Sequence, residues 1–457
     1  MNLAEYIDAR RDQHLAELYE LLRIPSVSAK SEHKPDIERG ANWVAGSLRA
    51  AGFKHVEIVP TALHPLVYAE SLEAPGKPTI LFYGHYDVQP AEPLDLWTSP
   101  AFEPTVRNGN LFGRGTADDK GQVHIHLKAL ESLQKVNGKF PINIKVLIEG
   151  EEEVGSSSLA TFLKENRAEL ACDAIVISDT GMPTPKHPAL TYALRGIAAF
   201  EITLHGPARD LHSGIFGGTV DNPAIALCQL LAKLRDKKGR VAIPGFYDDV
   251  QPLSPFERKQ LARLPFNARA YQKFLGVPRL FGERGFTSIE QRSARPTLEI
   301  NGLTSGYQGE GSKTIVPAWA RAKITTRLVP DQNPARIIKL VRKHLARLCP
   351  PTARLEIQGG HGAEPYLVSP TGPQAQAALR ALKAAFGYEP VLMREGGSIP
   401  IVNDFKKILG ADALLLGLAL PDDNPHSPNE KFDLDCFAKG QLMSAHLWQE
   451  LSACEAS

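Results

Sequence analysis

The spacing of hydrophobic positions changes twice along the chain, and the first part alternates between strand-like and helix-like patterns. Continuous apolar runs that suit buried strands occupy residues 78–84, 142–148 and 174–178. Apolar residues recur at helical spacing within residues 123–136, and residues 156–166 also suit a helix. This β-α-β-α-β order predicts an α/β fold with a doubly wound, mostly parallel sheet and helices on both faces.

A different pattern begins near Arg195 and ends near residue 368. It predicts strands at residues 197–204, 319–328 and 354–358 and helices at about 223–237 and 334–348, while residues 244–296 show no clear period. The α/β pattern then returns with a helix at 374–386 and a strand at 413–420. We therefore predict one α/β domain, made of residues 1–194 and 368–457. It is interrupted by an inserted α+β domain of residues 195–367 with an antiparallel sheet.

Charge and composition narrow the function classes. The 457 residues include 52 lysines and arginines against 51 aspartates and glutamates, a balance that gives no support to a nucleic-acid partner. The most apolar stretch, residues 413–420, is too short to cross a bilayer, and the chain begins with an amphipathic helical pattern rather than a signal peptide. Five scattered cysteines without a CxxC pair indicate reduced thiols. We expect a cytoplasmic protein without nucleic-acid or membrane partners.

Histidines and acidic residues follow the strands predicted in the α/β part. They are His85 and Asp87, Asp118 and Asp119, Glu151 to Glu153, Asp179, and His426. Ligands of open α/β sheets bind beyond the carboxyl ends of the strands, so these side chains are expected to meet at one edge. A single histidine or aspartate at a strand end is more often a cap or a turn residue. Convergence of five such places favours a metal site.

Histidine and carboxylate ligands without cysteine suit catalytic zinc. Two ions that lie close together need a bridging carboxylate, and each could then have one histidine, one terminal carboxylate and a share of the bridge. Because residues i and i+2 of an extended segment point the same way, Asp87 can lie behind His85 and accept the proton of its non-ligating nitrogen.

Two other patterns resemble functional motifs but do not meet their requirements. His124 and His126 have the HxH form of another metallohydrolase class, but they fall in a helical pattern, so we expect surface or core histidines. Gly113-Arg-Gly115 lacks the third glycine of a dinucleotide-binding loop.

Several longer motifs span most of the chain. They are GHYDVQP (84–90), WTSPAFEPTVRNGNLFGRGTADDKG (97–121), EGEEEVGS (149–156), ISDTGM (177–182), DLHSGIFGG (210–218), TRLVPDQNP (326–334), REGGSIP (394–400) and PHSPNEKF (425–432). In this order they resemble the di-zinc metallopeptidase family of aminoacylases, glutamate carboxypeptidases and dipeptidases. They look most similar to its cytosolic non-specific dipeptidase (carnosinase-like) branch.

The resemblance implies a complete metal centre. His85 would bind one zinc ion and His426 the other, with Asp118 bridging the two. Glu153 and Asp179 would be the terminal carboxylate ligands. The implied cofactors are two Zn²⁺ per subunit, with Mn²⁺ or Co²⁺ as substitutes.

The resemblance also implies catalytic roles. Glu152 would be the general base, Asp87 would orient His85, and His212 would reach the active site of the partner subunit. The peptide bond between Asp118 and its neighbour would be cis. Relatives often carry a non-acidic residue in place of Glu151, for which we expect a solvent-facing position.

Substrate contacts follow from the same resemblance. Arg327 and the turn at Gly397 and Ser398 would hold a substrate carboxylate, and His361 and Thr314 match further substrate contacts. The inserted domain would serve as lid and dimerisation domain of a homodimer. The expected function is hydrolysis of dipeptides or short peptides with a free C-terminal carboxylate. An N-acyl-amino-acid deacylase on the same site and a catalytically silent binding homologue are the alternatives.

Overall fold

The computed structural model describes residues 1–397 and 399–455, with the side chain of His361 outside the description. The chain forms two compact units. Unit 1 comprises Met1–Tyr192, Val368–Met393 and Ile401–Ser457, and unit 2 comprises Ala193–Leu367 and Arg394–Pro400. The boundaries near 194 and 367 resemble those expected from the sequence, whereas the short segment 394–400 groups with unit 2, which the hydrophobic pattern did not indicate.

A nine-stranded sheet forms the centre of unit 1, in the order β1-β2-β6-β3-β7-β17-β8-β15 with β16 beside β8. Strands β6, β3, β7 and β17 pair in parallel, and β1, β2 and β8 pair antiparallel with their neighbours. The sheet is therefore mixed, with a parallel centre. The strand bounds are β1 His55–Val59, β2 Leu66–Ser71, β3 Thr79–His85, β6 Asn143–Glu149, β7 Ala174–Ile177, β8 Ala189–Leu194, β15 Tyr366–Leu367, β16 Val391–Glu395 and β17 Asp412–Leu415.

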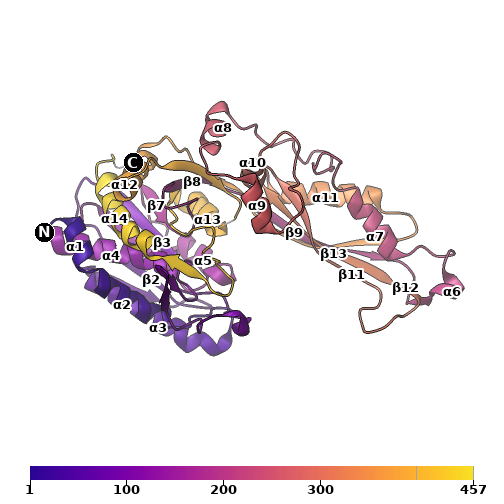
Figure 1. Cartoon of the computed structure of the whole chain (residues 1–457), viewed down its shortest axis with the longest axis horizontal. Helices are drawn as coiled ribbons and strands as arrows, with labels where there is room; N and C mark the ends of the chain where they lie inside the picture. The colour runs from indigo at the N-terminus through magenta and orange to yellow at the C-terminus, as the bar shows by residue number, and fades with distance from the viewer. Residues whose placement is uncertain (398, 456–457) are drawn as a thin grey trace. The chain divides into compact units, whose positions relative to one another are not determined.

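Helices cover both faces of this sheet (Figure 1). Neighbouring residues of β3 point to opposite faces: Phe82 contacts His126 of α4, and Tyr83 contacts Phe405 of α13, with ring centroids 4.4 and 5.0 Å apart. The predicted doubly wound arrangement is confirmed. The helices of unit 1 are α1 Leu3–Ala9, α2 Arg11–Leu22, α3 Lys34–Ala50, α4 Lys120–Asn137, α5 Leu159–Glu165, α12 Pro373–Phe386, α13 Pro400–Leu409 and α14 Leu434–Leu451. A small sheet joins β4 Thr105–Arg107, β5 Asn110–Phe112 and β18 Lys431–Asp433.

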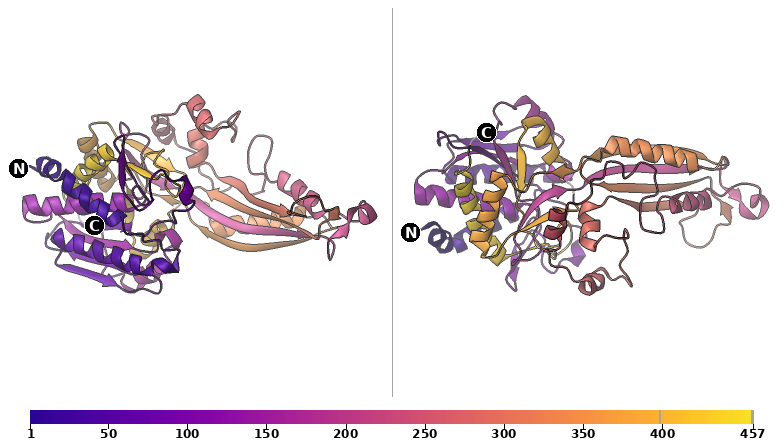
Figure 2. Two further views of the ribbon diagram at one scale, coloured as in Figure 1. Left: turned by 60° about the horizontal axis from the view of Figure 1, so that its bottom comes forward. Right: turned by 90° about the horizontal axis from the view of Figure 1, so that it is seen from above.

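Unit 2 contains a four-stranded antiparallel sheet in the order β11-β13-β9-β14. Alternate residues of β9 point to one face, where they form an apolar core with helices α7 and α11. Both helices lie along this sheet in Figure 2. The element bounds are β9 Gly196–His205, β10 Leu211–His212, α6 Ser213–Phe216, α7 Pro223–Ala232, β11 Thr297–Ser305, β12 Ile315–Val316, β13 Trp319–Leu328, α11 Pro334–Leu348 and β14 Arg354–Ala363.

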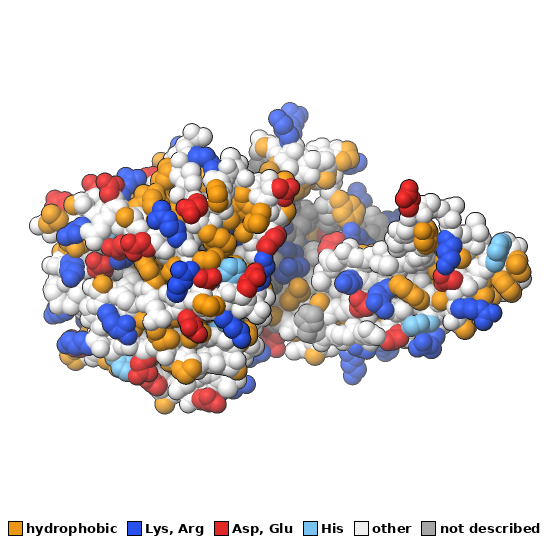
Figure 3. All heavy atoms as spheres, turned by 90° about the horizontal axis from the view of Figure 1, so that it is seen from below, with side chains coloured by type: hydrophobic (Ala, Val, Ile, Leu, Met, Phe, Trp, Pro, Cys, Tyr) orange, Lys and Arg blue, Asp and Glu red, His pale blue; other side chains and the backbone are white. Residues whose placement is uncertain are grey.

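The stretch without a hydrophobic period contains three short helices: α8 Pro255–Leu261, α9 Ala268–Leu275 and α10 Ser288–Ala294. Each begins at a residue whose side chain accepts a hydrogen bond from the first turn, namely Ser254, Asn267 and Thr287. No described helix combines the length and the apolar character that a membrane span needs. On the face seen in Figure 3, acidic and basic side chains are interspersed.

Candidate metal centre

Among the described residues, two groups of side chains that could hold a metal ion lie in unit 1 and share one residue. The first group is His85, Asp118 and Asp179, and the second is Asp118, Glu153 and His426. Within each group one ligand atom per residue lies within 4.8 Å of the others. All five residues predicted as metal ligands are thus brought together, and Asp118 is common to both groups.

The sheet order explains why these residues meet. His85 ends β3, Asp179 follows β7, and Glu153 lies in a 3₁₀ turn (Glu152–Val154) just after β6. These strands are parallel neighbours, so their carboxyl ends share one edge. His426 follows β17, the next strand of the sheet, and adopts a left-handed backbone conformation with φ 60°.

The two carboxylate oxygens of Asp118 face different histidines. His85 Nε2 lies 3.2 Å from Asp118 Oδ1, and His426 Nε2 lies 2.8 Å from Asp118 Oδ2. His426 Nε2 is also 3.3 Å from Glu153 Oε2. Although Asp118 Oδ1 is near, the buried His85 Nε2 makes no hydrogen bond of suitable geometry to any described residue, which suits a nitrogen that coordinates a metal. The peptide bond between Asp118 and Asp119 is cis.

Asp87 contacts both His85 and the acidic turn after β6. Its Oδ1 lies 3.3 Å from His85 Nδ1, so a proton shared there would leave Nε2 free to bind a metal. The same carboxylate accepts hydrogen bonds from the backbone N–H groups of Glu152 and Glu153, at 3.3 and 3.1 Å. One buried aspartate therefore positions a histidine and the acidic turn together.

Crowding of carboxylates in a buried place shifts their ionisation. Burial raises the pKa of Glu153 to about 8, and the negative charge of Asp118 adds to this effect. Burial and the neighbouring Asp118 and Asp119 hold the pKa of Asp179 well above its usual value. The hydrogen bond with Asp118 raises the pKa of His426 to about 9. In the metal-free protein Glu153 and His426 therefore carry protons at neutral pH, and divalent cations would replace them, so the donor set fits a dinuclear metal site.

Glu152 lies on the same turn as Glu153. Burial raises its pKa, and the charges of His85 and Asp118 act on its carboxyl group. The residue expected to be the base is therefore close to both ligand groups.

The expectation of a solvent-facing Glu151 is wrong, because this side chain points inward and is only 2% exposed. Its carboxylate accepts hydrogen bonds from the N–H groups of His64 and Ser158, at 2.9 and 3.0 Å, and from the Thr61 and Ser157 hydroxyls. Glu151 thus connects the loop after β6 with the segment that precedes β2 through hydrogen bonds.

Glu430 and Arg114 are supporting residues that the sequence did not identify. Both are fully buried, and Arg114 donates to Glu430 Oε2 at 2.7 Å. The Glu430 carboxylate also accepts from the N–H groups of Gly115, Ala117 and Asp118. The signal was present, since Glu430 lies in the motif that contains His426.

Those predicted substrate contacts that the structure describes lie in unit 2, as does His212. His212 and Thr314 are neighbours, because β10 pairs with β12 and the Ser213 N–H donates to the Thr314 carbonyl at 3.0 Å. Arg327 lies near the end of β13. The Gly397 carbonyl accepts from the Arg195 N–H. Ser398 and the side chain of His361 lie outside the described residues.

The HxH pair in α4 belongs to the core. His124 and His126 are completely buried, and burial holds the pKa of both below the usual value. His126 lies between the Ser178 and Ser444 hydroxyls, at 2.7 and 2.8 Å. These histidines pack helices against the sheet, as expected for core residues.

Most of the chain is similar to known metallopeptidases. The sequence model of peptidase family M20/M25/M40 matches residues 81–450. A Cys-Gly metallodipeptidase of Schizosaccharomyces pombe is 33% identical, over 99% of this chain and 98% of that protein. A beta-Ala-His dipeptidase of Rattus norvegicus is 30% identical, over 98% and 95%. The crystal structure of the M20 family metallo-carboxypeptidase Sso-CP2 from Sulfolobus solfataricus superposes with a TM-score of 0.84, at 31% identity over 96% of this chain and 99% of that one.

Proposed function

Since this chain belongs to peptidase family M20/M25/M40 and is a hydrolase of that family, we propose that it is a di-zinc dipeptidase. Its substrates are dipeptides or short peptides with a free C-terminal carboxylate. The observation that carries the proposal is the pair of ligand groups that share Asp118. Full-length similarity to dipeptidases at 30% identity or more supports the substrate class.

The reaction would be hydrolysis of the amide bond. Zinc ions held by the two ligand groups would lower the pKa of a water molecule, so that hydroxide is available near neutral pH. Glu152 takes the proton of the attacking water and passes it to the leaving amine. Asp87 keeps His85 in the ligating tautomer and holds the backbone of the Glu152 turn.

Unit 2 supplies the substrate contacts in this proposal. The Arg327 guanidinium holds the substrate carboxylate by two hydrogen bonds, assisted by the turn at Gly397 and Ser398. His361 and Thr314 make further contacts. His212 acts in the partner subunit of a homodimer, where it stabilises the oxyanion that develops at the scissile carbonyl. An exposed apolar edge on β11, with Ile300 and Leu303, supports a homodimer formed through unit 2.

Metal identity and location are also proposals. A donor set of histidines and carboxylates without cysteine supports zinc as the native metal, with Mn²⁺ or Co²⁺ able to replace it. All five cysteines are free thiols, which supports a reducing, cytoplasmic location.

The test is product release from a panel of dipeptides and matched N-acyl amino acids, with zinc-loaded protein and a chelated control. The expected result is metal-dependent cleavage of dipeptides. Cleavage of acyl amino acids alone would make the protein a deacylase with the same metal centre. Two bound metals without cleavage of either class would contradict the dipeptidase proposal and favour a silent binding protein.

A further inference from the structure

Residues 24–28 form a short segment that follows helix α2 and precedes the region matched by the family model, which begins at residue 81. Connecting segments normally run over the protein surface. Here Ser26 and Val27 are buried, with exposed fractions of 0% and 2%. Backbone and hydroxyl groups buried in this way need hydrogen-bond partners, and their partners lie in the loops of the metal centre.

Ser26 is hydrogen-bonded to the loop that follows β3. Its Oγ donates to the Tyr86 carbonyl at 2.6 Å, and the Val88 N–H donates to the Ser26 carbonyl at 2.9 Å. Val27 and Val88 also form an isolated parallel β-bridge. Because these contacts reach the residues before and after Asp87, they hold the backbone on both sides of it.

Lys120 connects the same segment with the loop that presents Asp118. Its side chain is fully buried, and Nζ donates to the Ile24 carbonyl at 2.6 Å and to the Leu21 carbonyl at 3.2 Å. Leu21 lies in the last turn of α2, where a positive charge is favourable. Lys120 is the first residue of α4, two positions after Asp118, so this contact also restrains the loop with the shared candidate ligand.

Ser28 is connected with a third loop through His64. The His64 Nε2 atom lies 3.0 Å from the Ser28 carbonyl, and the His64 N–H donates to the Glu151 carboxylate at 2.9 Å. Glu151 directly precedes the turn that carries Glu153. Three loops with candidate metal ligands are therefore linked to one buried segment.

We propose that residues 24–28 support the metal centre and that Ser26 and Lys120 are positioning residues. Ser26 would position the loop with Asp87, and Lys120 the loop with Asp118. The inference rests on the proposed function, because it concerns the zinc ions that this function requires. Both residues act through the backbone of the ligand loops, and metal–ligand distances tolerate displacements of only roughly 0.2 Å.

The first test is the zinc affinity of Ser26→Ala, measured by titration against a competing chelator. Zinc should bind about ten-fold more weakly, a usual effect of losing a group that orients a ligand. Ser132→Ala is the matched control, because Ser132 is also 0% exposed and its Oγ donates to the Lys128 carbonyl at 2.7 Å. The control should keep wild-type zinc affinity, and thermal unfolding compares the stability of the two variants. Wild-type zinc affinity in folded Ser26→Ala would overturn the inference.

A double-mutant cycle separates positioning of the His85 loop from general damage. His426→Ala retains the ligand group that contains His85, so adding Ser26→Ala should weaken zinc binding by about the same factor as in wild type. In His85→Ala the additional effect should be much smaller, because the histidine of that loop is already absent. Equal losses in the two backgrounds would contradict the positioning role.

Lys120→Met tests the second contact, because methionine keeps most of the side-chain length and lacks the N–H donors. Zinc affinity should fall about ten-fold, and it should fall in both histidine backgrounds, since Asp118 belongs to both ligand groups. Wild-type zinc affinity in folded Lys120→Met would refute the role of Lys120. If this variant does not fold, the Ser26→Ala measurements decide the proposal.

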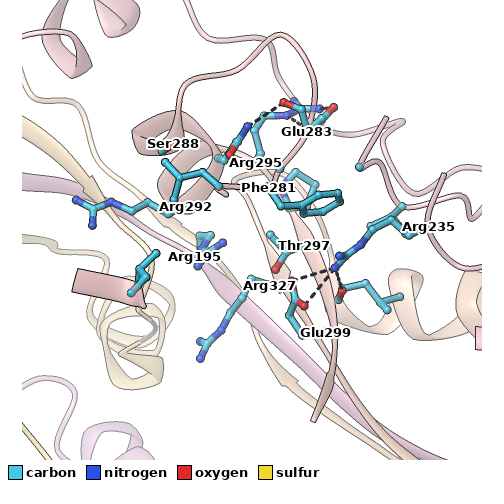
Figure 4. A pocket seen from close by; sticks show the side chains of 18 of the residues that line it. Arg195, Arg235, Phe281, Glu283, Ser288, Arg292, Arg295, Thr297, Glu299 and Arg327 are labelled. Atoms are coloured by element: carbon cyan, nitrogen blue, oxygen red, sulfur yellow. Dashed lines mark hydrogen bonds and ion pairs between the residues drawn. The ribbon is translucent and has the colours of Figure 1, made fainter. Parts of the chain in front are cut away.

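Substrate binding should not depend on Ser26. Arg195 and Arg327 line a pocket of about 580 Å³ in unit 2 (Figure 4), whereas Ser26 lies in unit 1. With zinc in excess, Ser26→Ala should therefore regain kcat and keep the wild-type KM for a dipeptide, and a raised KM would contradict the inference. Weaker zinc binding in Ser26→Ala without dipeptide cleavage by wild type would uphold the positioning role and refute the proposed function. Dipeptide cleavage with unchanged zinc affinity would do the reverse.

Discussion

The carboxylate of Glu430 accepts a hydrogen bond from the backbone N–H of Asp118 at 3.1 Å, although the two residues are 312 positions apart in the chain. The same oxygen accepts from the Ala117 N–H at 2.9 Å. The loop that presents the shared ligand is therefore held by a buried carboxylate that would not itself bind metal. Arg114 compensates the charge of Glu430 from the other side.

Replacing Glu430 by alanine should weaken both metal binding and folding. It would leave the buried Arg114 charge and three backbone N–H groups without this acceptor, a loss of about 3–5 kcal/mol in stability. Zinc affinity should fall about 10–100-fold, the usual effect of losing a group that orients a ligand. Zinc titration and urea unfolding measure the two effects. Asp435→Asn, at an exposed position nearby, serves as the control, and wild-type zinc affinity in Glu430→Ala would refute the orienting role.

Replacing Glu152 by glutamine should separate metal binding from turnover. Elemental analysis should still find both metals, because this residue is not among the five candidate ligands. The value of kcat should fall about 10²–10⁴-fold, the range typical for loss of a general base. Glu165→Gln removes an exposed carboxylate from α5 and should leave kcat unchanged. A Glu152→Gln enzyme with near-normal kcat would assign the base elsewhere.

Metal affinity should rise with pH. In the metal-free protein the pKa of His426 is raised to about 9, so the ring is protonated at neutral pH and must lose its proton to bind metal. Zinc binding should therefore release protons, and its apparent affinity should increase up to about pH 9. Calorimetry in two buffers with different ionisation enthalpies counts the protons. Proton release that is the same in His426→Ala would show that the histidine is not a ligand.

The raised pKa of His426 also affects the stability of the folded, metal-free protein. A histidine whose pKa is raised by folding adds stability that is fully present below its unfolded pKa of about 6.5 and disappears as pH rises through its folded pKa. The metal-free protein should therefore lose stability between about pH 6.5 and 9. The melting temperatures of metal-free wild type and His426→Ala, measured across this range, should converge at high pH.

Glu151 is expected to contribute to stability rather than to chemistry. Burial alone would raise its pKa, but hydrogen bonds from His64 and Ser158 lower it overall. A lowered pKa adds stability above the unfolded value, about 4.3, which is lost as pH falls through the folded value. Glu151→Ala should cost about 1–3 kcal/mol at pH 7, because buried donors lose their acceptor. The free energy of unfolding of metal-free wild type and Glu151→Ala should be measured at pH 7 and pH 3.5. The difference between the two proteins should be smaller at pH 3.5.

His212 gives a test of sharing between subunits. His212→Ala should retain its metals and lower kcat, because the side chain lies in unit 2, outside both ligand groups. Co-refolding inactive His212→Ala with inactive Glu152→Gln should restore part of the activity, since a mixed dimer can assemble one complete site. Each variant refolded alone is the control. Activity that does not recover in mixtures shown to contain heterodimers would exclude action across the interface.

Local patterns predicted the main elements well. The strand at 319–328 and the helix at 334–348 have the bounds expected from their period, because each buries one continuous face. The helices α8–α10 were missed, although Ser254 with Glu257 and Thr287 with Glu290 form capping boxes that mark two of their starts. These helices are too short to display a period.

The grouping of the candidate metal ligands could be predicted from the sequence, whereas the residues that support them could not. A candidate ligand such as His85 lies at the carboxyl end of a strand. Neighbouring parallel strands place their carboxyl ends at the same edge of the sheet, so this grouping follows from the strand pattern alone. The direction of Glu151 depends on donors about 90 positions earlier, and the role of Glu430 depends on a loop more than 300 positions earlier. Hydrogen-bond partners this far apart in the chain leave no pattern near the residue itself. The sequence therefore could not predict that the Glu151 side chain is buried.

The late position of β17 has a consequence for how the protein is made. This strand lies between β7 and β8 in the sheet, yet it is encoded after the whole of residues 193–367. While the ribosome is still synthesising those residues, β7 has an open edge, and His426 does not yet exist. The central strand β7 of the nascent chain therefore remains unpaired on one side for a long time. Chaperones would be most useful during this period. A metal ion that His426 would help to hold can bind at its full site only after this residue has been synthesised.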